Sequence, residues 1–178
     1  MQTMKFAPLS MSVALLVSAC GAGVETRISS SGTTPTEPGT YMVTLPVVGT
    51  PSDLSAANQR VAEKLSAKGF AVSETAALHL EVTLDARDAA LALGSAAGPQ
   101  SLSTAKRKKP LQSCKDMEYR LGVTLTRVAD GAEIYRGRAA EYHCRMTVAE
   151  ALPALVDSAL ADLGQPRGSY TVMRSAKD

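Results

Sequence analysis

The stretch EYRLGVTLTRVADGAEIYRGRAAEYHC, residues 118–144, decides the fold of this chain. From Tyr119 to Leu125 it alternates apolar and polar residues, which is typical of a strand with one buried face. Asp130-Gly131 is a strong hairpin signal, and the return strand runs from Glu133 to Cys144. The stretch therefore predicts a β-hairpin with a two-residue turn. Its core candidates are Tyr119, Leu121, Val123, Leu125 and Val128.

Helical patterns precede and follow this hairpin. Leu54, Ala57, Val61 and Leu65 recur at three- and four-residue spacing after Thr50-Pro51, and Gly69 is suited to ending a helix there. A second apolar stripe follows Thr147-Val148-Ala149-Glu150, which reads as a capping box. Pro153 conflicts with a cap at Thr147, so either this helix kinks or its regular part starts nearer Ala149.

Two further strands complete the expected domain, at 41–48 and 78–84. The element order β-α-β-β-β-α predicts an α+β fold, a two-layer sandwich in which two helices cover one face of a four-stranded mixed sheet. We expect a single domain at 40–164 with a long loop at 88–113, and a mobile tail at 165–178.

The N-terminus has the layout of a secretory signal peptide, with Lys5 before a mostly apolar run. Val17-Ser18-Ala19-Cys20 resembles a bacterial lipobox. That resemblance implies cleavage after residue 19, lipid on Cys20 and a flexible tether at 20–39. The alternatives are an ordinary signal peptide and a short membrane anchor, although the apolar run is short for a bilayer span. Gly21 favours the outer membrane, facing the periplasm, by the sorting pattern of enterobacterial lipoproteins.

Lipid on Cys20 leaves Cys114 and Cys144, and an oxidising periplasm makes a disulfide their default state. A larger loop or one bulge in the hairpin would bring them near opposition. The alternative is a metal site formed by Cys114, His143 and Cys144. Because adjacent residues of a strand point to opposite faces, His143 and Cys144 would not easily converge on one ion, so we favour the disulfide and expect no metal.

The charged residues do not indicate a nucleic-acid partner. The chain has a net charge of +2 and no Trp, so we expect no nucleic-acid partner. The run Lys106-Arg107-Lys108-Lys109 is either a solvated loop tip or a contact for anionic lipid head groups or an acidic protein.

We expect no catalytic residues and no cofactor. The chain lacks a nucleophile elbow, a zinc-protease helix motif and a glycine-rich phosphate loop. His79 reads as a solvent-facing strand residue, and Asp85 and Asp88 as solvated carboxylates at a strand end. A non-catalytic binding or envelope-assembly module, anchored in the membrane through Cys20 and contacting an envelope protein, is the favoured function.

The chain resembles a group of small bacterial lipoproteins that share a domain of unknown function. The resemblance rests on residues 61–70 and 130–139, including Arg136-Gly137, although Tyr135 stands where that group often has Trp. The topology also resembles the lipopolysaccharide-assembly lipoprotein, whose motif after the lipidated Cys is absent here. That second resemblance implies an alternative function as a component of an outer-membrane lipopolysaccharide translocon.

Overall fold

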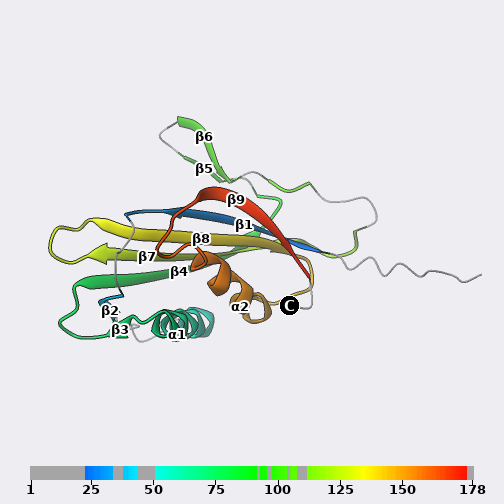
Figure 1. Cartoon of the computed structure of the whole chain (residues 1–178). Helices are drawn as coiled ribbons and strands as arrows, with labels where there is room; N and C mark the ends of the chain where they lie inside the picture. The colour runs from blue at the N-terminus through cyan, green and yellow to red at the C-terminus, as the bar shows by residue number, and fades with distance from the viewer. Residues whose placement is uncertain are drawn as a thin grey trace, which may run out of the picture.

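The computed structural model describes residues 23–33, 38–43, 51–91, 93–95, 98–103, 105–107 and 112–175. Two helices lie against one face of a seven-stranded sheet, whose order is β3-β2-β4-β7-β8-β1-β9 (Figure 1). The predicted α+β class is confirmed, whereas the prediction of four strands is wrong.

The strands of the main sheet are β1 (Val24–Ser31), β2 (Thr40–Val43), β3 (Ala71–Val72), β4 (Leu78–Asp88), β7 (Met117–Arg127), β8 (Glu133–His143) and β9 (Gly168–Arg174). β2 runs parallel to β3 and β4, and the other neighbours are antiparallel. The predicted loop 88–113 contains a separate hairpin of β5 (Leu93–Ser95) and β6 (Gly98–Ser103). The part of the first predicted strand beyond Val43 lies outside the described residues, as does Thr50.

Strand β1 corrects the predicted tether at 20–39. It lies between β8 and β9 and pairs with both along most of its length. Its inward-facing residues are Thr26, Ile28 and Ser30, and all three are buried. Because two of the three are polar, the segment has no apolar alternation by which a sequence pattern would reveal a strand.

Strand β9 corrects the predicted mobile tail at 165–178. It adds to the free edge of β1, so its backbone hydrogen bonds are made to the supposed tether. Most of its side chains are exposed, including Val172 and Met173, which explains why burial patterns in the sequence do not indicate it.

Helix α1 (Ser52–Ala67) begins one residue later than predicted, with Pro51 before its first turn and no side-chain cap. Its end is as expected. Gly69 has a φ of 88°, its N–H bonds the Ser66 carbonyl at 2.9 Å, and the Phe70 N–H bonds the Leu65 carbonyl at 3.0 Å. This is a Schellman arrangement, and it turns Phe70 into the core.

Helix α2 (Val148–Ala159) begins directly after Thr147, whose hydroxyl accepts from the Glu150 N–H while the Glu150 carboxylate accepts from the Thr147 N–H. The predicted capping box is confirmed. The helix starts at Val148, directly after the cap and one residue before Ala149, and it contains Pro153. Among the described helices, none is long and apolar enough to cross a membrane.

The hairpin of β7 and β8 differs from prediction at its turn. Leu125 pairs with Tyr135 and Thr126 with Glu133, with a bulge between them, and five residues connect the strands. The two-residue turn is therefore wrong, and both the larger loop and the bulge considered as its alternatives are present. Val128 falls in this connection and is 52% exposed, so it is not a core residue.

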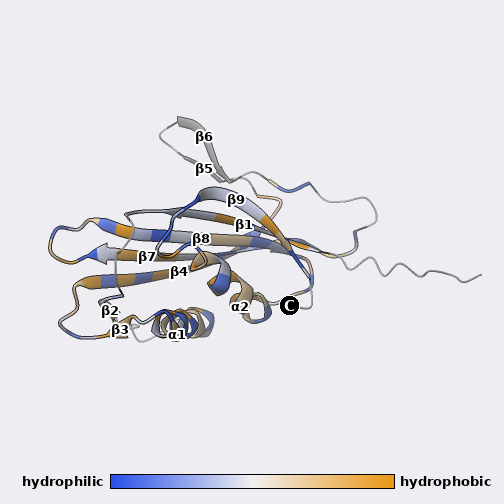
Figure 2. Cartoon of the chain, viewed as in Figure 1, coloured by the Kyte–Doolittle hydropathy of each residue, from blue (hydrophilic) through white to orange (hydrophobic). Residues whose placement is uncertain are grey.

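The core lies between the helices and the sheet. Figure 2 shows alternating blue and orange bands along the central strands, as expected when one face is buried. The fully buried residues of this layer include Val61, Leu65, Leu80, Leu121, Val123, Leu125, Tyr135, Leu152, Leu155 and Leu160.

Gly137 brings the end of α2 onto β8. A Cβ built there would lie 1.9 Å from the Ala159 carbonyl oxygen, which the Tyr135 hydroxyl also bonds at 2.6 Å. We therefore expect Gly137→Ala to lower the free energy of unfolding by about 1–3 kcal/mol through overpacking. Urea denaturation measures this loss.

Gly122→Ala is the matched control, because a Cβ there meets the Thr83 side chain at 2.6 Å, and that side chain can rotate. We expect a clearly smaller loss. Equal losses in the two variants would show that close approach of α2 is not what requires Gly137.

Candidate functional site

The face of the sheet away from the helices carries the candidate site. Strand register places side chains of this open face in rows across the sheet. In one row, Arg120 of β7 lies opposite Ala140 of β8, which lies opposite Arg27 of β1. In the next row, Arg138 of β8 lies between Gly122 and Ser29. Three arginines from three strands thus surround a floor of small residues.

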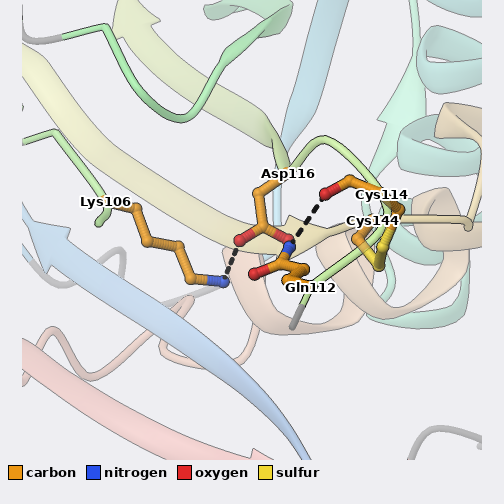
Figure 3. Close-up of a disulfide and its surroundings, with 5 residues drawn as sticks. All are labelled: Lys106, Gln112, Cys114, Asp116 and Cys144. Atoms are coloured by element: carbon orange, nitrogen blue, oxygen red, sulfur yellow. Dashed lines mark hydrogen bonds and ion pairs between the residues drawn. A yellow bond between two sulfur atoms is a disulfide. The ribbon is translucent and has the colours of Figure 1, made fainter. Parts of the chain in front are cut away.

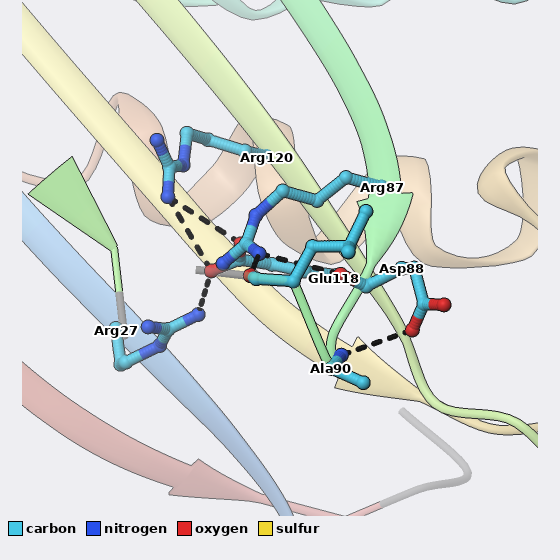
Figure 4. Close-up of polar contacts among 7 residues, drawn as sticks. Arg27, Arg87, Asp88, Ala90, Glu118 and Arg120 are labelled. Atoms are coloured by element: carbon cyan, nitrogen blue, oxygen red, sulfur yellow. Dashed lines mark hydrogen bonds and ion pairs between the residues drawn. The ribbon is translucent and has the colours of Figure 1, made fainter. Parts of the chain in front are cut away.

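Glu118 organises the arginines around it. Its side chain is 1% exposed, and Arg27, Arg87 and Arg120 all direct guanidinium groups to its carboxylate (Figure 4). The contact from Arg120 is the longest, at 3.4 Å. Burial alone would raise the pKa of Glu118, but the hydrogen bond from Arg27 and the three positive charges outweigh it and lower that pKa. The carboxylate therefore stays ionised and holds the arginines in place.

A groove of about 480 Å³ lies beside this cluster. Its polar lining comes from β1, β7, β8 and β9, and consists of Arg27, Ser29, Arg120, Arg138, Ser169, Tyr170 and Thr171. Ile28, Ala139 and Ala140 supply the remainder. The groove combines guanidinium and hydroxyl groups with small side chains, which suits a polar, negatively charged ligand.

Tyr142 fixes one wall of the cluster. The guanidinium carbon of Arg27 lies 4.3 Å from the centroid of its ring, and Nζ of Lys106 lies 4.8 Å from it. Both are cation–π contacts, which restrict the two side chains. Lys106 also pairs with Asp116 at 2.9 Å.

A second buried polar cluster lies on the helix side, at the end of the sheet where β1 begins. Glu141 is fully buried and accepts from Arg174 at 2.7 and 2.8 Å and from the Thr26 hydroxyl at 2.5 Å, and it bonds His143 at 2.7 Å. Although burial raises the pKa of Glu141, the hydrogen bonds from Arg174, His143 and Thr26 lower it to about 2. Its partners all come from the sheet, so the cluster serves to join β1, β8 and β9.

Cys114 and Cys144 form a disulfide in the structure, with their Cα atoms 5.4 Å apart (Figure 3). The Gln112 side chain donates to the Cys114 carbonyl at 3.2 Å. The His143 ring stacks on Tyr119, with centroids 5.6 Å apart, instead of joining the cysteines. No group of three potential metal ligands occurs in the described part of the chain.

The remaining predicted site residues are partly beyond the described residues. Cys20, Lys108 and Lys109 lie outside them. Arg107 is exposed, whereas Lys106 is held by Asp116 and Tyr142. Asp88 is not a free carboxylate, because it pairs with Lys115 at 2.9 Å.

The sequence pattern did not identify the three groove arginines as site residues. Arg27 fell in the predicted tether, and Arg120 and Arg138 read as ordinary solvent-facing strand residues. The one available signal was the concentration of Arg at outward positions of the predicted hairpin, namely Arg120, Arg136 and Arg138. Only the pairing of β1 with β8 brings Arg27 beside them.

The chain is similar in fold to solved structures, but no family is identified for it. No family model and no curated protein matches the chain. A PDZ domain protein from Parabacteroides distasonis matches 85% of this chain with a TM-score of 0.52 at 10% identity, and the chain spans 39% of that protein's length. Two PelC dodecamer structures from Paraburkholderia phytofirmans match 80% of this chain and 99% of theirs, with TM-scores of 0.49 at 14% and 11% identity. The likeness to the Parabacteroides distasonis protein is one of fold alone.

Proposed function

We propose that this chain is a lipid-anchored protein of the bacterial envelope, held in the outer membrane facing the periplasm, and that it acts as a non-catalytic binding or assembly module. The observation that carries the binding function is the arginine-lined groove on the open face of the sheet. Helices cover the other face, so the open face is the one that a ligand or partner can reach (Figure 1). The lipobox-like Val17-Ser18-Ala19-Cys20 supports the anchor.

The position of β1 sets how close an anchored domain would lie to the membrane. Val24 follows Cys20 by four residues, which span at most about 14 Å when fully extended. A lipid on Cys20 would therefore hold this end of the sheet near the head groups, in contrast to the twenty-residue tether expected from the sequence. The groove begins with Arg27 on the same strand, so it would face the membrane-proximal periplasm.

The anchor has a direct test. We expect mass spectrometry of the membrane-extracted protein to show an N-terminal Cys20 carrying acyl chains. Cys20→Ser should remain an uncleaved precursor, because the thiol that accepts the lipid is gone. A soluble mature chain beginning at another residue would contradict the anchor.

Partner recovery tests the binding function. Wild-type protein purified from detergent-solubilised envelopes should retain a bound ligand or partner. The variant with both Arg120→Gln and Arg138→Gln should not retain it. Recovery of translocon proteins by both forms would favour the lipopolysaccharide-translocon alternative, because that association would then not depend on the groove.

A further inference from the structure

The arginines of the groove have many more hydrogen-bond donors than the described residues use. Each guanidinium has five N–H groups. Arg27 donates through one nitrogen to Glu118, while its buried Nε has no partner in the described structure. Arg120 reaches Glu118 only at 3.4 and 3.5 Å through a single nitrogen. Arg138 is exposed and makes no hydrogen bond or ion pair with any described residue.

The side chains in and around the groove also carry more positive than negative charge. Arg27, Arg87 and Arg120 share the single carboxylate of Glu118, and Arg138 adds a further positive charge two rows along the same face. Asp85 lies opposite Arg120 across β4 and β7, but it does not line the groove. Among the described residues, the lining carries three positive charges and no negative one, which is an arrangement complementary to an oxyanion.

The rest of the lining favours an oligosaccharide over a protein segment. Ser29, Ser169 and Thr171 offer hydroxyls on adjacent strands, whereas the Tyr170 hydroxyl bonds Asp162 on the helix side of the sheet. The apolar lining is small, with no pocket for the large side chain that anchors a typical protein interface. Sugar hydroxyls form hydrogen bonds with such donors and acceptors, and an open groove accommodates several linked sugar residues.

We propose that the groove binds an anionic oligosaccharide. Its carboxylate or phosphate groups pair with Arg27, Arg120 and Arg138, and its hydroxyls bond those of Ser29, Ser169 and Thr171. This inference rests on the proposed binding function and names the ligand class of the same site.

Calorimetric titration of the mature protein in nonionic detergent tests it. The probes are a galacturonate hexamer, a phosphorylated mannohexaose, an uncharged galactose hexamer and a hexaglutamate peptide. We expect one or both anionic sugars to bind, with affinity that falls as salt rises. Replacing Arg120 and Arg138 together with Gln should weaken this binding at least tenfold, because two charge-assisted contacts are lost.

Arg60→Gln is the control, since it removes one exposed positive charge on α1, on the other side of the sheet, and should bind as wild type does. Arg138→Gln alone, whose side chain has no partner to lose in the described structure, covers the case in which the double variant unfolds. Equal binding of the uncharged hexamer, tighter binding of hexaglutamate, unchanged binding by the variants, or no binding to either anionic sugar would each overturn the inference. The titration does not depend on lipid at Cys20, so its failure is separable from failure of the anchor.

Discussion

Replacing Glu141 with alanine is expected to lower the free energy of unfolding by about 3–5 kcal/mol, because it leaves partners of a buried charge unpaired. Arg174 contributes two hydrogen bonds to this carboxylate and is largely buried itself, and the Thr26 hydroxyl and the His143 ring contribute one each. The loss would fall on the strands that Glu141 joins. Urea denaturation at neutral pH measures it.

The same carboxylate should make stability depend on acid pH. Its pKa is about 2 in the folded chain, against an ordinary value of 4.5. A lowered pKa contributes stability that is fully present above pH 4.5 and is lost as the pH falls toward 2, by on the order of 3 kcal/mol. We therefore expect the difference in stability between wild type and Glu141→Gln to shrink across this interval.

Glu81→Ala is the matched control for both measurements. Glu81 lies on the open face of β4, is exposed, and its side chain forms no hydrogen bond or ion pair with a described residue. Its removal should change stability by less than about 0.5 kcal/mol. If Glu141→Ala unfolds at the same urea concentration as Glu81→Ala, the buried cluster does not stabilise the fold.

The elements that could be predicted from sequence are those whose burial is apolar and local. The β7–β8 hairpin has Leu121, Val123 and Leu125 at alternate positions, and both helices have apolar stripes, with a recognisable end for α1 and a recognisable start for α2. Each of these signals is contained in a single segment, so it can be read without knowing what lies beside it.

Strands β1 and β9 could not be predicted because their stabilising contacts are polar and distant. Thr26 and Ser30 are buried only because Glu141 and Asp162, more than a hundred residues away, accept their hydrogen bonds. Without those partners, a segment rich in Ser and Thr reads as a linker. Strands β1 and β9, together with the two-residue strand β3, increase the number of strands in the main sheet from the expected four to seven.

The groove was inaccessible to prediction for the same reason. Its arginines come from β1, β7 and β8, and their juxtaposition depends on a register that no local pattern contains. By contrast, the cysteine pair could be predicted, because both residues lie at the open end of one hairpin, Cys114 shortly before β7 and Cys144 directly after β8.

Reducing the disulfide should also have a large effect. Cys114 and Cys144 are separated by 30 residues, and closing a loop of that length stabilises a fold by about 3–4 kcal/mol in the chain-entropy model. The stabilisation arises in the unfolded chain, where the link forbids extended conformations of the hairpin. We therefore expect reductant to lower the melting temperature by about 10 °C.

The variant with both Cys114→Ser and Cys144→Ser should melt like the reduced wild type, and reductant should not shift it further. Non-reducing peptide mapping should recover residues 114 and 144 in one cross-linked peptide. The disulfide joins the segment before β7 to the start of the connection to α2, so its loss should free both segments while the core between Leu121 and Leu155 keeps its packing. Free labelling of both thiols in the native protein would contradict the cross-link. An unchanged melting temperature on reduction would show instead that the Tyr119–His143 stack and the Glu141 cluster hold that end of the sheet without it.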